Sequence, residues 1–456
     1  MVVVGGGNAG LCAALEARDA GASALLVDSA PRAMRGGNSR HTRNLRAMHE
    51  GPTEFLTHSY RQEEYWQDLL KVTEGETEEH LARIVIQGTV EALPFMSRHG
   101  VHFQQALSGT LSLSRTNAFF LGGGKALVNA YYEACERAGI DIAYDCEVTA
   151  LHIDRSSVRA IEFLDQQGAH SIVAKAVVVA SGGYQANLDW LAIAWGERAK
   201  NFRIRGTPYA KGLVLRNLLD QGVSTVGDPL QCHAVAVDAR APQFDGGIVT
   251  RIDCIPFSIV VNREGLRFYD EGEDVWPKRY AIWGRLVAMQ PEQTAFAIID
   301  AKAERLFMPT AFRPVEAESI EALAAKLSIP AAVLVETVRA YNQAVRLGRF
   351  VSTELDECHT EGLDPPKSHW ARKIDTAPFK AYPLSPGITF TYLGVKVDEH
   401  GRVQMENGVP MKNLFACGEI MAGSILGKGY LAGFGMAIGT IFGRRSGHSA
   451  ARHAYS

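Results

Sequence analysis

Three glycines near the start of the chain have the spacing of a loop that holds a pyrophosphate. Gly5, Gly7 and Gly10 follow the apolar run Val2–Val4 and lead into an alanine-rich helical pattern that opens at Asn8. The first glycine permits a tight turn, the second permits close approach of a pyrophosphate, and the third permits close packing of helix on strand. The helix N-terminus then faces the phosphates. The pattern predicts a dinucleotide-binding βαβ unit.

An acidic residue ends the second apolar run of this unit. Asp28, followed by Ser29, stands where a carboxylate accepts hydrogen bonds from a ribose diol. A carboxylate here disfavours the 2′-phosphate of NADP, which an arginine would hold. The sequence therefore favours FAD or NAD.

A second glycine-rich segment, near the C-terminus, distinguishes these two cofactors. The run NLFACGE places Glu419 at the end of a predicted strand, and a helix rich in small residues follows from Gly433. A second helix N-terminus therefore points back toward the ligand. An extended FAD requires such a distant second contact, whereas a nicotinamide dehydrogenase does not, so we expect FAD.

Composition limits the classes of partner. The 456 residues are 46% hydrophobic and 21% charged, enough for a large core and two or more domains. The net charge of −3, without a polybasic block, gives no reason to expect nucleic acid. Seven scattered cysteines without a CxxC pair predict neither a zinc nor an iron–sulfur site and suit a reducing compartment. With no membrane-length apolar run and no room for a leader before the glycine loop, we expect a cytoplasmic protein.

The elements that position these residues predict an α/β fold, a Rossmann-like FAD-binding domain with an inserted α+β capping domain. A β-meander leads into a buried strand that ends at Gly182 and Gly183. Proline and charge then increase, and Glu318–Arg346 is helical in pattern. The expected boundaries are 1–231 and 387–456 for the FAD-binding domain and 232–386 for the capping domain.

Four motifs occur in an order that resembles the FAD-binding subunits of succinate dehydrogenases and fumarate reductases. They are GGGNAG at 5–10, GGNS at 36–39, VVVASGG at 177–183, and ACGE with GYLAG between 416 and 433. The resemblance covers nearly the whole chain and implies a mobile cap over the substrate. The cofactor-binding residues that the glycine pattern and the resemblance together predict are Gly5, Gly7, Asn8, Gly10, Asp28, Ser29, Gly37, Asn38, Ser39, Gly182, Gly183, Glu419 and Leu431. His41 is out of register with the histidine that bonds to flavin in the membrane-bound members, so we expect non-covalent FAD.

Longer stretches are most similar to the tricarballylate dehydrogenase branch of this family. They include GGNSRHTRNLRAMHEGP, FYDEGEDVWPKRYAIWGRLVA and ILGKGYLAG. This likeness implies oxidation of tricarballylate to cis-aconitate by α-proton abstraction and hydride transfer to flavin N5. It also implies a separate iron–sulfur and heme partner, through which the protein would lie at the inner membrane. Two alternatives stay open: the flavoprotein of precorrin-3B synthesis in cobalamin formation, and a fumarate-reductase-like reductase of 2-enoates.

A polycarboxylate substrate requires cations that fix carboxylates and a group that exchanges the α-proton. The resemblance implies that His233 contacts a carboxylate and that Arg279 moves the proton. Phe390 and Tyr430 stand where fumarate reductases carry a histidine and an arginine, so plain fumarate or succinate chemistry is not expected. Tyr392 and Tyr430 are predicted to orient the substrate or to exchange a proton. The predicted substrate-binding cations are Arg267, Arg205, Lys278 and Lys428.

Overall fold

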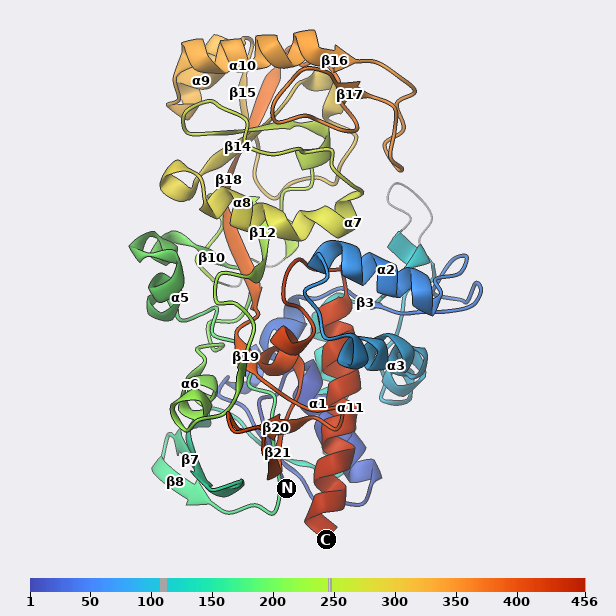
Figure 1. Cartoon of the computed structure of the whole chain (residues 1–456), viewed down its shortest axis with the longest axis vertical. Helices are drawn as coiled ribbons and strands as arrows, with labels where there is room; N and C mark the ends of the chain where they lie inside the picture. The colour runs from blue at the N-terminus through green and yellow to red at the C-terminus, as the bar shows by residue number, and fades with distance from the viewer. Residues whose placement is uncertain (107–112, 245, 247, 456) are drawn as a thin grey trace.

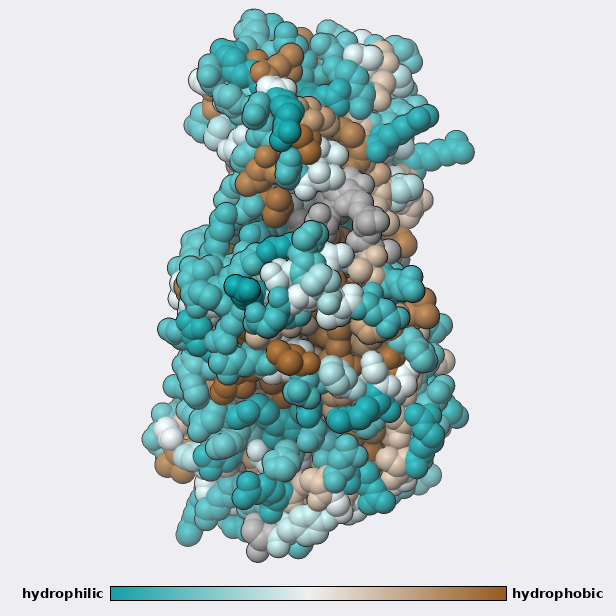
Figure 2. Space-filling view, turned by 90° about the vertical axis from the view of Figure 1, so that its right-hand side faces the viewer, coloured by the Kyte–Doolittle hydropathy of each residue, from teal (hydrophilic) through white to brown (hydrophobic). Residues whose placement is uncertain are grey.

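The chain is long and divides into two parts around different sheets. The computed structural model describes residues 1–106, 113–244, 246 and 248–455. Figure 1 shows both termini in the lower part and helices α9 (Ile320–Leu327) and α10 (Ala331–Ala344) at the top of the upper part. The face in Figure 2 is mostly hydrophilic, with hydrophobic side chains in short, interrupted groups and a narrower outline between the two parts.

The lower part is built on a six-stranded sheet in the order β20-β21-β9-β1-β2-β5. Its strands are β1 (Val2–Val4), β2 (Leu25–Val27), β5 (Asp141–Ala143), β9 (Val177–Val179), β20 (Arg402–Gln404) and β21 (Pro410–Ala416). Helix α1 (Asn8–Asp19) joins the parallel strands β1 and β2, which forms the predicted βαβ unit. Only the β20–β21 pair is antiparallel among the described pairs. The continuous apolar runs of β1 and β9 are buried on both faces, as central parallel strands require.

Helices cover this sheet and bring the two ends of the chain together. Helix α11 (Phe434–Tyr455) packs along α1, as Figure 1 shows. Helices α2 (Gln62–Thr73) and α3 (Glu79–Arg98) follow one another before residue 99. Helix α4 (Gly123–Arg137) begins directly after Gly122. Among the described residues, none of the helices combines the length and the hydropathy needed to cross a membrane.

The predicted β-meander is confirmed beside this sheet. It consists of β6 (Glu147–Asp154), β7 (Ser157–Asp165) and β8 (Gly168–Ile172), which pair in antiparallel order. The shorter elements around both parts are β3 (Asn44–Arg46), β4 (Asn117–Phe119), α5 (Leu188–Trp195), α6 (Leu213–Asp220), β11 (Thr225–Val226), β16 (Val345–Arg346), β17 (His359–Thr360) and β19 (Gly394–Val395).

The upper part is organised by the long strand β18 (Phe379–Thr391), which reaches down to the lower part in Figure 1. Its partners are β10 (Arg203–Ile204), β12 (Cys232–Asp238), β14 (Ala295–Ile299) and β15 (Val315–Ala317), and β13 (Ile259–Asn262) pairs with β14. Helices α7 (Trp276–Arg279) and α8 (Trp283–Ala288) lie on the β12 side. Because β18 runs on past residue 386 and β10 precedes residue 232, the expected domain boundaries cut through this sheet and remain predictions.

The helical pattern expected for Glu318–Arg346 is confirmed in the upper part. The stretch forms two helices, α9 and α10. Ser328 ends α9 with a left-handed backbone, φ 56°, and Pro330 precedes α10. Proline has no N–H to continue a helical ladder, so the chain turns there.

Candidate active site

An elongated cavity runs from the glycine loop after β1 to the lower end of β18. At one end it is lined by the loop after β1, the 3₁₀ turn Gly37–His41, the loop after β9 and the start of α11. At the other end its lining is cationic and aromatic. The residues there include Arg43, Arg205, His233, Arg251, Trp276, Tyr280, Phe390 and Tyr430. The two ends therefore suit different ligands.

The glycine loop leaves no room for side chains. Gly5 has φ +105°, and a Cβ atom there would lie 2.4 Å from the carbonyl oxygen of Ala180. A Cβ atom on Gly10 would lie 1.9 Å from the carbonyl oxygen of Gly5. The start of α1 is thus pressed against the loop, and its N-terminus opens on the cavity. A pyrophosphate fits this arrangement of backbone N–H groups and helix dipole.

A buried carboxylate lies beside the glycine loop. Asp28 accepts hydrogen bonds from the Ala30 N–H at 3.0 Å and from the Tyr132 hydroxyl at 2.9 Å. Arg35 stacks over the Tyr132 ring, with its guanidinium carbon 4.5 Å from the ring centroid. Burial raises the pKa of Asp28. The carboxylate is therefore held in one orientation at the position predicted for a ribose diol.

A second buried carboxylate lies beyond β21, at the middle of the cavity. Glu419 accepts from the Thr391 N–H at 2.9 Å and from the Gln185 side-chain amide at 3.3 Å. Burial raises the pKa of Glu419 to about 7. Within the described part of the chain, the Ser181 hydroxyl and the Gln185 side-chain oxygen are buried without a hydrogen-bond partner. Such atoms suit a ligand rich in hydroxyl groups, so the glycine cradle, the two carboxylates and these atoms together fit an extended dinucleotide.

Most of the residues predicted to bind the cofactor line this cavity. Those in the lining are Gly5, Gly7, Asn8, Asp28, Ser29, Gly37, Asn38, Ser39, Gly182 and Glu419. The other three, Gly10, Gly183 and Leu431, are not in the lining that the described residues form. Gly10 serves helix packing, and Leu431 is fully buried. A Cβ atom on Gly183 would lie 2.0 Å from the Thr391 hydroxyl, so this glycine brings β18 close.

Asn38 fastens the cavity wall to the upper sheet. Its side-chain amide donates to the Thr389 carbonyl at 2.5 Å, and its side-chain oxygen accepts from the Thr207 N–H at 2.9 Å. Ser39 accepts from the Asn8 N–H at 2.9 Å. These bonds hold the turn Gly37–His41 between α1 and β18.

Three arginines gather at the opposite end of the cavity. Arg251 forms a two-point ion pair with Asp253, with contacts of 2.6 and 2.9 Å. Arg205 donates to the Thr389 hydroxyl at 3.0 Å, and its Nε has no partner among the described atoms. Burial, and then the charge of Arg251, lower the pKa of Arg205 and of Arg43 to about 10. The cluster holds more positive charge than Asp253 neutralises, which is the electrostatic environment of an anion site.

Two aromatic rings enclose His233 beside this cluster. Its imidazole stacks on Tyr430 with centroids 3.9 Å apart, and Tyr280 meets it edge-on at 5.5 Å. Burial, and then Arg205, lower the pKa of His233 well below its usual value, so the ring is neutral at neutral pH. Its Nε2 is buried with no hydrogen-bond partner in the described chain. The Tyr430 hydroxyl accepts from the Gly435 N–H at 3.0 Å, at the start of α11.

Five of the residues predicted to be catalytic or to bind the substrate lie outside the cavity lining that the described residues form. Arg279 pairs with Glu273 at 2.6 Å and Lys278 pairs with Asp68 at 2.6 Å. Lys428 forms an ion pair with Glu74, and the buried Tyr392 donates its hydroxyl to the Gly429 carbonyl.

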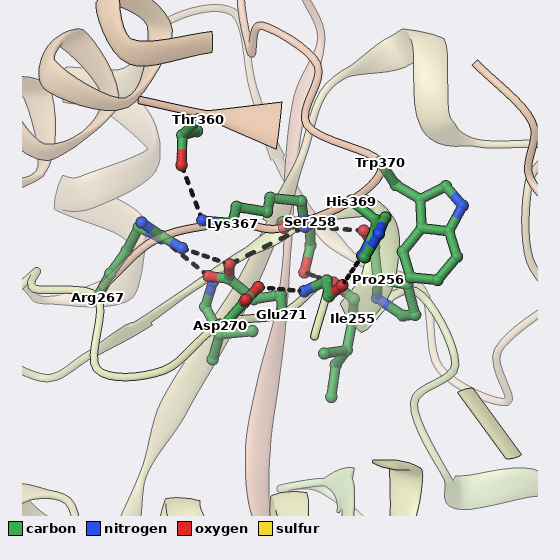
Figure 3. Close-up of polar contacts among 12 residues, drawn as sticks. Ile255, Pro256, Ser258, Arg267, Asp270, Glu271, Thr360, Lys367, His369 and Trp370 are labelled. Carbon is green, nitrogen blue, oxygen red and sulfur yellow. Dashed lines mark hydrogen bonds and ion pairs between the residues drawn. The ribbon is translucent and has the colours of Figure 1, made fainter. Parts of the chain in front are cut away.

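The fifth, Arg267, belongs to a separate buried cluster shown in Figure 3. Arg267 holds Glu271 with bonds of 2.6 and 3.0 Å and also donates to the carbonyl of Pro365. Lys367 donates to the carbonyls of Pro256 and Ser258, each at 2.8 Å. Each of these cations has its partners within the protein, so the cluster joins loops of the upper part.

Two residues of the cationic end, Arg43 and Tyr280, were absent from the predicted site. Arg43 follows the GGNS motif by four positions, and Tyr280 is the immediate neighbour of Arg279. The Arg-rich loop after GGNS was a usable signal for Arg43. Nothing in the spacing separates Tyr280 from Arg279, because a one-residue change along a short helix turns a side chain by about 100°.

Among the residues that the structure describes, no group of three or more His, Cys, Asp or Glu side chains could hold a metal ion.

The family of the chain is shown by its match, over residues 1–435, to the model of the FAD binding domain family. The chain therefore belongs to this family. It is an FAD-dependent oxidoreductase, similar to the flavoprotein fumarate reductases and to other enzymes that act on CH–CH groups or carbon–carbon double bonds.

Curated relatives extend over all or part of the chain. NADH:fumarate oxidoreductase of Klebsiella pneumoniae is 26% identical over all of this chain and 48% of its own length. A probable fumarate reductase of Shewanella frigidimarina is 26% identical over all of this chain and 75% of its length. NADH:acrylate oxidoreductase of Vibrio harveyi is 29% identical over 68% of this chain and 30% of its length. The chain thus spans about half or less of two of these three relatives.

Solved structures confirm the mixed helix and strand fold. The open conformation of a flavocytochrome c3 fumarate reductase matches with a TM-score of 0.76 and 23% identity, over 100% of this chain and 78% of that one. The 3-ketosteroid-Δ4-(5α)-dehydrogenase of Rhodococcus jostii matches with a TM-score of 0.75 and 21% identity, over 99% and 96% of the two chains.

Proposed function

We propose that this flavoprotein dehydrogenates a small polycarboxylate, with tricarballylate, giving cis-aconitate, as the first substrate to test. The observation that carries the proposal is the excess charge of Arg43, Arg205 and Arg251 over the single carboxylate Asp253. Buried cations are retained where they are paired or bind a ligand. A substrate with two or more carboxylates supplies the missing negative charge, and arginine grips a carboxylate through two parallel N–H groups.

The reaction requires removal of an α-proton and of a hydride from the neighbouring carbon. Bound FAD supplies the hydride acceptor. The arginine cluster fixes the carboxylates, and the stack of His233 on Tyr430 forms one wall against which the carbon chain lies. Among the residues of the cavity, we assign the proton to His233 Nε2, since this nitrogen has no hydrogen-bond partner in the described chain.

Substrate binding itself would prepare His233 for this role. Arg205 and Arg251 both lower the pKa of the imidazole. Carboxylates that bind these arginines offset their charges, so the pKa of His233 rises in the complex and the ring becomes a better proton acceptor. Tyr280 lies beside both His233 and Arg251, with its ring centroid 4.9 Å from the guanidinium carbon, and helps to fix their orientation.

The electrons then leave the flavin for a separate protein with iron–sulfur and heme centres at the membrane. Support comes from relatives named as cytochrome-type fumarate reductases. A test is whether a purified iron–sulfur and heme protein reoxidises the substrate-reduced flavin faster than oxygen does.

A second candidate is reduction of a 2-enoate, the reverse direction. The names of the relatives, reductases of fumarate and of acrylate, favour it. The same residues serve, because a protonated His233 would donate the proton that it accepts in the oxidation. The corrin alternative has no comparable observation in its favour.

The test is an anaerobic titration of the FAD-loaded protein near 450 nm. Tricarballylate should bleach the flavin, and succinate and citrate serve as parallel controls. In the reverse assay, cis-aconitate and fumarate are added to dithionite-reduced protein. Bleaching by none of the acids, together with rapid reoxidation by fumarate, would replace the dehydrogenase proposal with the reductase.

A further inference from the structure

A second cavity, of about 490 Å³, lies between α2 and the upper part. One wall is apolar and aromatic. It is formed by Val275, Trp276, Pro256, Phe257, Leu306, Phe307, Met308, Pro309 and Trp370. The other wall carries the charged side chains Arg46, Arg115, Glu64 and Asp68 from the lower part. The proposed reaction assigns nothing to this space.

Two residues line both cavities: Leu113 and Trp276. The Trp276 indole N–H donates to Asp253 Oδ1 at 2.7 Å, and the same oxygen accepts from Arg251 at 2.6 Å. The ring also packs near Tyr280, with centroids 6.3 Å apart. The indole is therefore fastened to the carboxylate that serves the arginine cluster, and it lies at the junction of the two spaces.

The short helix that carries Trp276 is held in place on both sides of this residue. Asp274 pairs with Lys71 of α2 at 2.5 Å, and Lys278 pairs with Asp68 of α2 at 2.6 Å. Because these two ion pairs hold the backbone on either side of Trp276, rotation of its indole ring can open the junction with less rearrangement than a movement of the helix.

The charge of the second cavity suits an anion. Its lining contains the four cationic side chains Arg46, Arg115, Lys278 and Arg305 and the three carboxylates Glu64, Asp68 and Asp253. The arginine cluster lies directly beyond the junction and adds to the positive potential. A cleft with a net positive lining raises the local concentration of anions.

We infer that the second cavity is the entrance through which an anionic substrate reaches the arginine cluster and that Trp276 is the gate between them. The inference rests on the proposed function. The residues that fit the dinucleotide line the opposite end of the first cavity, so the bound cofactor closes that end. A substrate must then arrive from the end where Leu113 and Trp276 line both cavities. Passage requires the indole to leave Asp253, so the hydrogen bond between them slows both entry and exit.

The test uses the FAD-loaded protein and malonate, a dicarboxylate that cannot be dehydrogenated at adjacent carbons. Stopped-flow absorbance of the oxidised flavin gives the association and dissociation rate constants of malonate. Trp276→Phe keeps a ring and removes the indole N–H. We expect both rate constants to rise about 10-fold, with the dissociation constant changed less than about 3-fold. Met308→Ala, which alters the same cavity away from the junction, should leave both rate constants within about 2-fold.

The outcomes separate the gate from the proposed function. Unchanged rate constants in Trp276→Phe, with normal malonate binding, would overturn the gate and leave the anion site intact. If only the dissociation rate constant increased in Trp276→Phe, Trp276 would be a contact for bound malonate, and this result would also contradict its role as a gate. If malonate gives no signal in the unaltered protein, the anion site fails, and sulfite, which adds to oxidised flavin and bleaches it, becomes the probe of access. A sulfite rate that Trp276→Phe leaves unchanged would overturn the gate by itself.

Discussion

Two buried clusters of charge in this molecule differ in how their cations are balanced. In the cluster of Figure 3, Arg267 and Lys367 have the Glu271 carboxylate and several carbonyl oxygens as partners. In the arginine cluster, the described carboxylate partner is Asp253, which pairs with Arg251, whereas the described side-chain partner of Arg205 is the Thr389 hydroxyl. The first arrangement is complete without a ligand, and the second requires an anion.

The number of arginines near a motif is therefore a poor indicator of function. The hydrogen-bond and ion-pair partners of each arginine are a better one. Burying an unpaired charge is costly, so a protein retains one where a ligand completes the pair. Substitutions in the arginine cluster should therefore mainly lower activity, whereas substitutions in the cluster of Figure 3 should mainly lower stability.

The largest expected effect is on activity in the arginine cluster. Arg205→Met removes a cation that we place on a substrate carboxylate, and its guanidinium is buried. Loss of one partner of a buried charge pair costs roughly 2–5 kcal/mol, so kcat/KM should fall by about 30-fold or more. The measurement is the rate of anaerobic flavin reduction by tricarballylate, with unfolding by urea as the control. A loss of stability with unchanged kcat/KM would reverse the assignment of this cluster.

The matching expectation for the other cluster concerns stability. The side chains of Arg267 and Glu271 are 4% and 0% exposed, so Arg267→Ala leaves a carboxylate buried without its main partner. The free energy of unfolding should fall by about 3–5 kcal/mol, measured by urea denaturation. Adding Glu271→Gln should restore part of it, since the unpaired charge is then gone. A variant of normal stability that had lost malonate binding would place Arg267 in the substrate site after all.

A smaller effect concerns how stability depends on pH through two buried carboxylates, Asp253 and Glu419. Arg251 lowers the pKa of Asp253, so the stability that this carboxylate contributes is lost on acidification below its ordinary pKa. Burial raises the pKa of Glu419 to about 7, so the native state of the FAD-free protein binds more protons than the unfolded chain between about pH 4.5 and 7. Stability should therefore fall across that range as pH rises, by at most about 3 kcal/mol.

Glu419→Gln isolates this contribution. In this variant, stability should no longer decrease between pH 5 and 7, as measured by thermal unfolding of the FAD-free protein in matched buffers. If the stability of Glu419→Gln decreased as much as that of the unaltered protein, the decrease would come from other titratable groups. Glu419→Ala should also lower the FAD content of purified protein, and full occupancy would remove Glu419 from the cofactor site.

The smallest expected effect is that of Arg279→Ala. The resemblance assigns this residue to proton transfer, but its guanidinium pairs with Glu273 outside the cavity lining. We expect less than about 3-fold change in the rate of flavin reduction. A loss above about 100-fold would return proton transfer to Arg279 and remove it from His233.

The cofactor end of the cavity could be predicted well from the sequence, and the cationic end only in part. Gly5, Gly7 and Asp28 lie within one βαβ unit, where local spacing fixes their relative positions. His233 and Arg205 also line the cavity, as predicted for site residues.

The substrate cations depend on pairs between distant segments, which spacing does not reveal. Lys278 pairs with Asp68 and Lys428 with Glu74, across 210 and 354 positions of the chain. Before the fold is known, neither carboxylate can be assigned to either lysine. The same limit hid Arg43, which meets Arg251 only when the turn after GGNS lies against the segment before β13.

The most direct test of the central claim is an anaerobic titration with tricarballylate of three FAD-loaded proteins at low temperature: the unaltered chain, Arg205→Met and Arg267→Met. The claim predicts that the flavin near 450 nm is bleached in the unaltered chain and in Arg267→Met, and that Arg205→Met stays oxidised. Equal bleaching in all three proteins, or loss of bleaching in Arg267→Met alone, would contradict it.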